Sequence, residues 1–371
     1  MHVVHEVWSS IHSAKVVILN PISEEKIHSE EIVQSPSSLM VKIGNIELGE
    51  FPLLLAPMED VSDPPFRAVC KMNGADLMYT EFISSEGLIR NARKSVQKLD
   101  VYDYERPIGI QFFGGEIDTM VHCVEIIEEA KPDLIDINFG CPVKGVACRG
   151  AGAGILRDVP KMVTMTGEIV KKATLPVTVK TRLGWDDKSI NIYEVAERLQ
   201  DVGIAALSIH GRTREQLYKG SANWEKIAEV KNNPRMRIPI FLNGDVTSVE
   251  KVKFIRDNYD VDGVMIGRAA IGNPWFFNEV KYFLQTGEHL PSPTIEERIN
   301  VSRTHLIKSV EWKEGRLGIL EMRKHYANYF KGLPNVKEFR DRLVRLESVE
   351  EIERVFSEMQ ESYQPTEAIA G

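Results

Sequence analysis

One cysteine stands where its thiol can act on a bound molecule. Residues 138–142 read Asn-Phe-Gly-Cys-Pro and directly follow the short apolar run 134–137. An unperturbed thiol has a pKa of about 8.5, so Cys141 is mostly protonated at neutral pH and can donate a proton. It would be a nucleophile only if a base lowered its pKa, and no His or Asp lies beside it in the sequence. The alternative is that Cys141 is a small buried hydrophobic residue, as most free cysteines are.

Further polar residues recur wherever a short apolar run ends. A single Lys or His at such a place is more often structural than functional. A whole ring of polar strand ends behind apolar strands is much harder to explain by chance. The ring consists of Pro57, Met58, Glu59, Glu81, Gln111, Asn138, Lys180, Arg182, His210, Arg212, Asn243, Gly244, Asp245, Gly267 and Arg268.

The last two strand ends indicate a phosphate site. Asn243-Gly-Asp245 and Gly267-Arg268 are glycine turns, and the first precedes a predicted helix. Free backbone N–H groups at such turns, together with Arg268, can hold a dianion. The alternative is that both are ordinary turns that cap helices.

A flavin is the group that best fits the remaining ring. A fixed cation such as Lys180, with His210 beside it, would stabilise the anionic reduced form of a flavin. Gln111 can form hydrogen bonds with the pyrimidine edge of the isoalloxazine. We expect no metal site, because the ring holds one His and scattered carboxylates rather than a set of ligands.

The elements that position this ring alternate between strand and helix. Helical patterns at 116–130, 160–173, 190–202, 224–232 and 248–259 separate the strands, so we predict an α/β fold of the (β/α)8 (TIM) barrel type over residues 40–290. A doubly wound open sheet is the alternative, but no G-x-G-x-x-G follows the first strand. The eight predicted strands are 51–58, 76–82, 107–113, 133–138, 176–182, 205–211, 238–243 and 262–267.

The two ends of the chain differ from the barrel. Residues 1–39 show no sustained period and are interpreted as a dispensable extension, and 41–48 as a β-hairpin. After the Pro-rich segment 290–293, residues 294–364 are predicted to form a smaller all-helical domain, with helices over 294–331 and 336–361. Within it, residues 312–345 contain 9 basic and 4 acidic side chains, which suits a polyanionic partner.

Bulk composition excludes several classes of protein. The chain has 371 residues, 43% of them hydrophobic, and a net charge of −8. The four cysteines have no CxxC spacing, so neither a disulfide framework nor a zinc site is expected. We therefore expect the protein in a reducing cytoplasm. No apolar run approaches the roughly 20 residues of a membrane span, and a monomer is expected. The glycine run 150–154 lacks the context of a dinucleotide loop and is interpreted as a flexible lid near the thiol.

In motif order the chain resembles the bacterial branch of the tRNA-dihydrouridine synthases over roughly residues 41–345. Phe139 stands where that family more often has Met, which conserves bulk. The matching motifs are Ala56-Pro-Met58, Asp63-Pro-Pro-Phe-Arg67, Gln111-Phe-Phe-Gly114, Asp136-Ile-Asn-Phe-Gly-Cys-Pro142, Lys180-Thr-Arg-Leu-Gly-Trp185, His210-Gly-Arg-Thr213, Asn243-Gly-Asp245, Gly267-Arg268, Met322-Arg-Lys-His325 and Lys331-Gly-Leu-Pro334.

The resemblance implies an enzyme that binds FMN and uses NADPH or NADH to reduce uridine in tRNA to 5,6-dihydrouridine. Cys141 would then be the catalytic acid for C5 of uridine, and Asn138 and Arg182 would contact the flipped nucleotide. Arg323 and Lys324, in the helical domain, would contact the phosphate backbone. The flavin would lie against the ring of strand ends, from Pro57, Met58 and Glu59 to Gly267 and Arg268.

Two other functions remain open at this point. A flavoenzyme for a small pyrimidine would explain the ring but would leave the helical domain without a role. A barrel that binds RNA without chemistry would not explain why Cys141, Lys180 and the phosphate site occur together.

Overall fold

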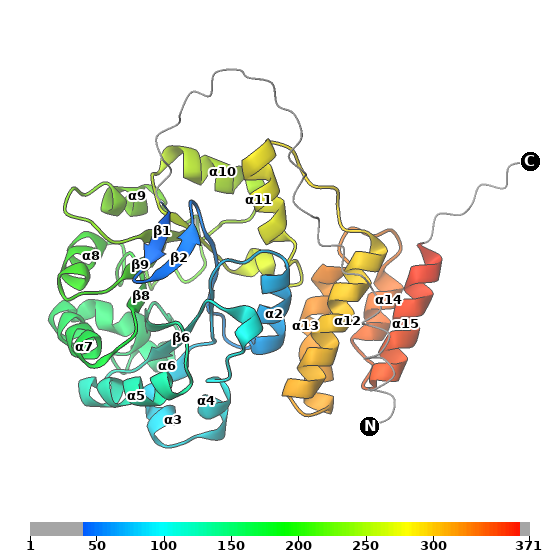
Figure 1. Cartoon of the computed structure of the whole chain (residues 1–371), viewed down its shortest axis with the longest axis horizontal. Helices are drawn as coiled ribbons and strands as arrows, with labels where there is room; N and C mark the ends of the chain where they lie inside the picture. The colour runs from blue at the N-terminus through cyan, green and yellow to red at the C-terminus, as the bar shows by residue number, and fades with distance from the viewer. Residues whose placement is uncertain (1–39, 364–371) are drawn as a thin grey trace, which may run out of the picture. The chain divides into compact units, whose positions relative to one another are not determined.

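The computed structural model describes residues 40–363 (Figure 1). The extension 1–39 lies outside the described residues, so its predicted dispensability stays a prediction. Residues 364–371 lie outside them as well.

Parallel strands form the barrel that the alternating pattern predicts. Their order around the sheet is β3-β11-β10-β9-β8-β7-β6-β4, and β5 adds a second short pairing to β6. A bridge between Leu54 and Leu77 brings the first strand beside the second, with Leu55 N–H donating to Leu77 C=O over 2.9 Å. The strands are β3 (Leu53–Leu55), β4 (Met78–Tyr79), β5 (Ile83–Ser84), β6 (Ile108–Phe113), β7 (Leu134–Phe139), β8 (Val177–Arg182), β9 (Ala206–His210), β10 (Ile240–Asn243) and β11 (Gly263–Ile266).

The second predicted strand, 76–82, is the one that differs. It is split into β4 and β5, since residues 80–82 between them belong to no strand. There the Thr80 hydroxyl donates to the C=O of Glu81. All the other predicted strands are confirmed as parallel members of one sheet.

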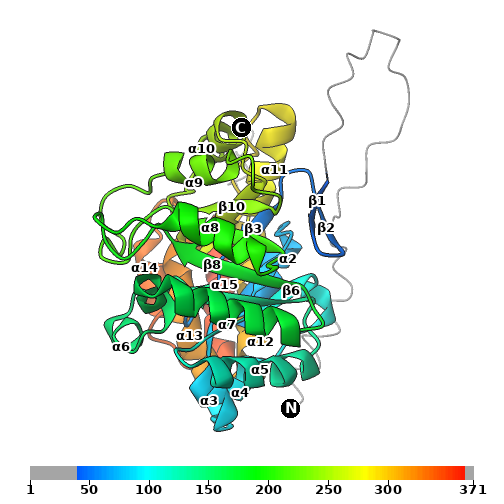
Figure 2. The same cartoon turned by 90° about the vertical axis from the view of Figure 1, so that its left-hand side faces the viewer.

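Helices cover the outside of the barrel, and the five predicted from periodicity are confirmed. Figure 2 shows α5, α7 and α8 in front of the strands that they connect. Two starts are capped: Asp158 accepts from Lys161 N–H at α7, and Ser248 from Lys251 N–H at α10. The longer helices are α2 (Pro64–Met72), α5 (Ile117–Glu129), α7 (Val159–Lys172), α8 (Ile192–Asp201), α9 (Glu225–Lys231), α10 (Val249–Asn258) and α11 (Phe276–Thr286).

Short helices fill the loops between strands and longer helices. They are α3 (Ser85–Ile89), α4 (Arg93–Gln97), α6 (Lys144–Ala147) and the 3-10 helices η1 (Asp103–Glu105), η2 (Gly152–Arg157) and η3 (Arg268–Ala270).

The predicted hairpin is confirmed and lies against the N-terminal ends of the strands. It consists of β1 (Val41–Ile43) and β2 (Ile46–Gly49), which pair antiparallel. Its apolar side chains share a buried cluster with Leu54 and Phe241, and a Cβ on Gly44 would lie 2.6 Å from Cγ of Pro176, just before β8. The opposite end of the barrel therefore carries the strand ends that hold the polar ring.

The C-terminal segment is all-helical, as predicted, but has more helices than predicted. The stretch 294–331 is interrupted at Gly315, which has a φ of 95°, and 336–361 is interrupted between 344 and 348. These helices bury a cluster of their own that includes Met322, Tyr326 and Phe356. They are α12 (Ile295–Trp312), α13 (Arg316–Tyr329), α14 (Lys337–Leu343) and α15 (Val349–Ser362).

This helical segment packs against α2 of the barrel. The rings of Phe66 and His325 stack with centroids 5.2 Å apart. Trp312 Nε1 donates to Asp100 Oδ2 over 2.9 Å, and Asn328 Nδ2 donates to the C=O of Ile271 over 2.9 Å. The second of these bonds reaches the loop after β11, next to the polar ring.

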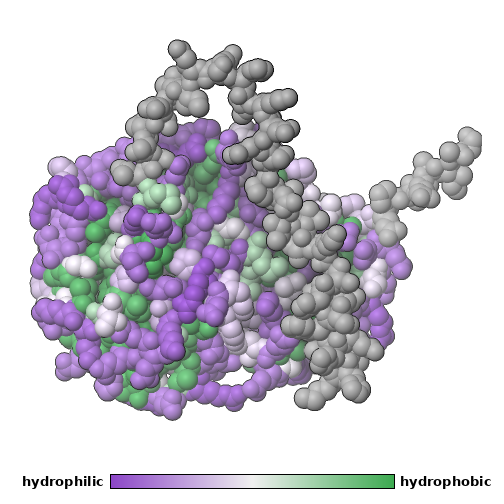
Figure 3. Space-filling view, viewed as in Figure 1, coloured by the Kyte–Doolittle hydropathy of each residue, from purple (hydrophilic) through white to green (hydrophobic). Residues whose placement is uncertain are grey.

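The face drawn in Figure 3 is mainly hydrophilic, with hydrophobic side chains in smaller groups between polar ones. Among residues 40–363, no helix is both long and apolar enough to cross a membrane.

Candidate active site

A cavity of about 830 Å³ opens at the C-terminal ends of the strands. Its size lies within the range of small-molecule and cofactor sites. Most of the ring predicted from strand ends lines it: Pro57, Met58, Glu59, Asn138, Cys141, Lys180, Arg182, His210, Asn243, Gly244, Asp245, Gly267 and Arg268. Gln111, Arg323 and Lys324 are not among the lining residues.

Cys141 lies at the cavity wall with its backbone held in place. The side-chain oxygen of Asn138 accepts hydrogen bonds from the N–H groups of Gly140 and Cys141, over 2.9 and 2.8 Å. The residue is only 5% exposed, and burial raises the pKa of its thiol. A thiol with a raised pKa stays protonated at neutral pH, which suits an acid better than a nucleophile. Cys70 and Cys123 are buried, whereas Cys148 is exposed.

The glycine run beside the thiol is closely packed over residues 151–156, which the interpretation as a flexible lid did not anticipate. Ala153 N–H donates to Cys141 C=O over 3.0 Å. A Cβ on Gly152 would lie 2.9 Å from the same oxygen, and one on Gly154 would lie 2.1 Å from Ala147 C=O. The glycines permit close backbone contact with the thiol loop.

Three nitrogen-bearing side chains from β8 and β9 line the cavity next to Cys141. Burial, followed by the nearby Arg182, lowers the pKa of Lys180 to about 8. Burial also lowers the pKa of His210 well below its usual range, with Arg182 and Lys180 adding to the shift, so the imidazole is neutral. Arg182 is held by the C=O groups of Gly140, Thr213 and Leu217 and pairs with no carboxylate among residues 40–363. This wall can therefore stabilise negative charge on a bound molecule.

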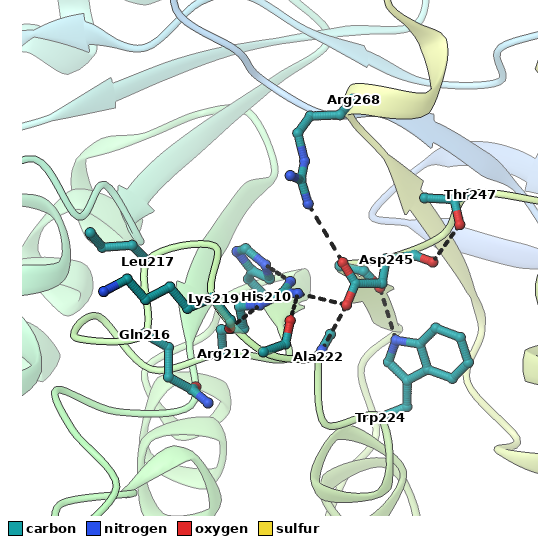
Figure 4. Close-up of polar contacts among 12 residues, drawn as sticks. His210, Arg212, Gln216, Leu217, Lys219, Ala222, Trp224, Asp245, Thr247 and Arg268 are labelled. Carbon is teal, nitrogen blue, oxygen red and sulfur yellow. Dashed lines mark hydrogen bonds and ion pairs between the residues drawn. The ribbon is translucent and has the colours of Figure 1, made fainter.

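Asp245 follows β10, the strand that pairs with β9, and is held between two arginines beside His210 (Figure 4). Arg212 Nη2 lies 2.7 Å from its Oδ2, and Arg268 Nη2 lies 3.5 Å from its Oδ1. Burial would raise the pKa of Asp245, but the N–H of Ala222 and the Arg212 guanidinium outweigh it and hold this pKa below the usual value. The ionised carboxylate would itself repel an anion, and it already pairs with both guanidinium groups.

The backbone at this point is available. No hydrogen bond from the N–H groups of Asp245, Val246 or Thr247 is found within residues 40–363. All three residues line the cavity, and Val246 is buried. A buried N–H group such as that of Val246 is almost always paired. Its free N–H, with those of the half-buried Asp245 and the exposed Thr247 on either side and Arg268 nearby, therefore offers a site for an anion.

Gln111 lies beneath the cavity rather than on its wall. It is fully buried, and its side chain bridges Asp136 and Asn138: Nε2 donates to Asp136 Oδ2 over 2.5 Å, and Oε1 accepts from Asn138 Nδ2 over 2.7 Å. Its amide is thus engaged with the neighbouring strand β7. This arrangement differs from the one expected for a residue that contacts a flavin edge.

Arg323 and Lys324 both have partners within the protein. Arg323 lies 3.5 Å from Glu347, and Lys324 lies 2.5 Å from Glu321 and also donates to the C=O of Asp60. Other cations of the helical segment are exposed and form no side-chain hydrogen bond or ion pair within residues 40–363. These are Lys331, Lys337, Arg345 and Arg354.

Three carboxylates, Glu59, Asp60 and Glu81, lie close together at the rim. Lys98 already occupies this cluster, with Nζ 2.5 Å from Glu59 and 3.6 Å from Glu81. The arrangement is an ion-pair network and gives no reason to invoke a metal.

The sequence analysis assigned no role to Tyr218, which lines the cavity, or to Trp185, which lies beside the cavity-lining Arg214. Tyr218 lies under Arg268, whose Cζ is 5.0 Å from the ring centroid. Trp185 has two guanidinium groups near its ring: Cζ of Arg157 at 4.2 Å and Cζ of Arg214 at 4.6 Å. Only the alternation of Arg with Trp and Tyr after β8 and β9 could have indicated these contacts.

The chain is similar to proteins of known family. Residues 54–364 match the model of the dihydrouridine synthase (Dus) family. A tRNA-dihydrouridine synthase B from Pseudomonas putida is 38% identical over 327 residues, covering 87% of this chain and 96% of its own. A probable tRNA-dihydrouridine synthase from Rickettsia prowazekii is 37% identical over 302 residues, covering 81% of this chain and 91% of its own.

Among solved structures, a histamine dehydrogenase from Rhizobium superposes with a TM-score of 0.53 at 10% identity. The match covers 75% of this chain and 53% of that protein, so the chain spans about half of its length. At this identity the likeness concerns the fold alone.

Proposed function

Because the chain belongs to the dihydrouridine synthase family, we propose that it reduces uridine in tRNA to 5,6-dihydrouridine. FMN is the cofactor, and NADPH or NADH is the reductant. The observation that carries this proposal is a protonated, buried thiol, Cys141, in the same cavity as the half-buried cation Lys180.

The residues of the cavity suit FMN. The free N–H groups of residues 245–247 and the Arg268 guanidinium would hold its phosphate. Lys180 and the neutral His210 would lie along its ring, and Pro57, Met58 and Glu59 would close the other side of the cavity. When bound, the flavin supplies the hydride that C6 of uracil accepts.

Cys141 supplies the proton. The C5=C6 bond of uracil is conjugated to the C4 carbonyl, so negative charge develops at C5 and O4 when C6 is reduced. The S–H bond of Cys141 breaks as a C–H bond forms at C5, and the resulting thiolate regains a proton from solvent. A raised thiol pKa keeps the proton in place until charge develops on the substrate.

The target base must leave the tRNA stack to enter the cavity. Asn138 and Arg182 line the cavity beside Cys141 and would contact the flipped nucleotide. Residues 40–290 would carry the cofactor and the chemistry, and residues 294–364 would bind the rest of the tRNA. Arg323 and Lys324 belong to this surface in our proposal, together with the exposed cations Lys331, Lys337 and Arg345.

The test uses purified protein. Its flavin is identified after release, and the reduced protein is mixed with unmodified tRNA, with free uracil and with orotate. Reoxidation by tRNA alone, with dihydrouridine in the product, supports the proposal. Reoxidation by the free pyrimidines would favour a small-molecule flavoenzyme. We further propose that the enzyme is a cytoplasmic monomer. Sedimentation of the purified protein tests whether it is monomeric.

A further inference from the structure

A continuous chain of hydrogen bonds joins a buried carboxylate to the backbone of the thiol. Asp136, in the middle of β7, accepts from Gln111 Nε2 over 2.5 Å. Gln111 Oε1 accepts from Asn138 Nδ2 over 2.7 Å, and Asn138 Oδ1 accepts from the N–H of Cys141 over 2.8 Å. Three side chains from two adjacent strands thus connect Asp136 with Cys141.

The polarity of this chain is set at its Asp136 end. Burial raises the pKa of Asp136 to about 6, so at neutral pH the carboxylate is mainly ionised and only accepts hydrogen bonds. Gln111 must then turn its NH2 group toward Asp136 and its oxygen toward Asn138. Asn138 must then donate to Gln111 with its NH2 group, which leaves its oxygen to face the thiol loop. If Gln111 flipped, Asn138 would lose its acceptor and its amide could turn an NH2 group toward the N–H of Cys141.

Asp136 has no evident structural reason to carry a charge. It is 1% exposed, and no Lys or Arg within residues 40–363 forms an ion pair with it. Its other hydrogen-bond partner is the hydroxyl of Thr178, at 2.5 Å. The titratable groups that interact electrostatically with Asp136 are Lys180 on β8 and Tyr79 on β4. Because a buried charge without a partner is costly, an apolar residue would fit the barrel interior better unless the carboxylate has a role.

We infer that Asp136 is a positioning residue: through Gln111 and Asn138 it fixes the backbone of Cys141 and thereby the place of the thiol in the cavity. This inference rests on the proposed role of Cys141 as the acid for C5. It assigns to Asp136 no contact with substrate or cofactor. A displacement of about 1 Å at a reacting group is enough to slow a reaction by roughly 100-fold.

Three variants test the inference. Asp136→Leu removes the acceptor, and Gln111→Met interrupts the chain in its middle while keeping a similar volume. Asp136→Asn is the conservative variant, because its oxygen can accept from Gln111 while its NH2 group donates to the Thr178 hydroxyl. Thr181→Val is the matched control: it removes a buried hydroxyl from the same strand as Thr178, and that hydroxyl bonds only to Phe139 C=O.

The measurement is rapid mixing of each reduced holoenzyme with unmodified tRNA, in H2O and in D2O. For Asp136→Leu and Gln111→Met we expect the maximal reoxidation rate to fall roughly 10-fold to 100-fold. The solvent isotope effect should rise, because transfer of the proton becomes the slow step. Flavin content, flavin reduction by NADPH and the half-saturating tRNA concentration should stay within about 2-fold of wild type. Asp136→Asn should recover most of the rate, and Thr181→Val should behave as wild type.

Two results would overturn the inference. One is a Gln111→Met enzyme with the wild-type rate and isotope effect. The other is loss of flavin from both Gln111→Met and Asp136→Asn, which would show that the chain only maintains the barrel. If wild-type reduced enzyme is not reoxidised by tRNA at all, the proposed function itself fails, and this outcome is distinguishable from the other two.

Discussion

Gly244 and His210 lie so close that no side chain fits between them. A Cβ on Gly244 would be 2.8 Å from Cδ2 of His210, and the φ of Gly244 is 113°. Only glycine combines that backbone conformation with room for the ring. The close approach places His210 next to the free N–H groups that follow Gly244.

We therefore expect Gly244→Ala to lower FMN content by displacing His210 and straining the turn. Absorbance of the purified protein gives flavin per chain, and circular dichroism verifies the fold. Gly167→Ala is the matched control, because its Cβ would lie 3.6 Å from Val202 in ordinary contact. Full flavin occupancy in Gly244→Ala would argue against a phosphate site at residues 244–247.

Cys141→Ala should keep its flavin and still accept hydride from NADPH. Reoxidation by tRNA should slow by about 10²–10⁴, the usual contribution of a positioned acid. Rapid mixing of the reduced variant with unmodified tRNA measures this step by itself. Cys148→Ala serves as the control, because that thiol is exposed. A wild-type rate in Cys141→Ala would mean that the proton comes from another group.

Arg214 is expected to contact the phosphate backbone of the bound RNA. It lines the cavity, stacks on Trp185, forms no ion pair within residues 40–363, and its Nε is buried without a partner. Arg214→Gln should weaken tRNA binding and flatten its salt dependence by roughly 0.7–0.9 units of log–log slope. Arg198→Gln, which removes a cation already paired with Glu194 on α8, is the control. An identical salt slope in the two variants would remove Arg214 from the RNA surface.

In the helical segment, exposed unpaired cations should matter more than paired ones. Replacing Lys337 and Arg345 by Ala should flatten the salt dependence of tRNA binding by up to about 0.9 units for each phosphate that the protein no longer neutralises. Replacing Arg323 and Lys324 should also weaken binding, but with a smaller change of slope, because Glu347 and Glu321 already neutralise them in part. Filter binding at several salt concentrations compares the two double variants. If both double variants had the same salt-dependence slope as wild type, this surface would not bind the phosphate backbone of tRNA.

Buried histidines between α12, α13 and α2 should make stability fall in acid. Burial, followed by the nearby Lys324, lowers the pKa of His325 to about 3, so the folded state binds fewer protons than the unfolded state between pH 6.5 and pH 3. In that window His325 should reduce the free energy of unfolding by up to about 1.4 kcal/mol per pH unit as pH falls. Burial raises the pKa of Asp63 to about 6. Between that pH and about 3.9 the folded state therefore binds more protons at Asp63 than the unfolded state, which increases the free energy of unfolding as pH falls.

His325→Phe isolates the histidine contribution, because Nδ1 of His325 has no hydrogen-bond partner within residues 40–363 and Phe can stack on Phe66. Urea unfolding at pH 7 and pH 5 should show a smaller loss of stability in this variant than in wild type. Equal losses in the two proteins would mean that His325 does not titrate in this range.

The architecture, and a thiol among the polar strand ends, could be predicted from local sequence patterns. Alternation of short apolar runs with helical patterns predicted the barrel, because strand and helix periods are local properties of the chain. The polar strand ends, with Cys141 and Lys180 among them, predicted the cavity, because parallel strands of a barrel all end at one face. The glycine at 244 was recognised as part of a turn, although its close approach to His210 was not.

Which polar residues have partners could not be predicted without the folded structure. Gln111 bridges Asp136 and Asn138 on the neighbouring strand, and Arg323 meets Glu347, 24 positions away in the sequence. Likewise, the closeness of Trp185 to Arg157 and Arg214 follows from how three loops meet at the mouth of the barrel. A residue's type and local pattern establish what it can bind, but its actual partner depends on which distant segments the fold brings within hydrogen-bonding distance.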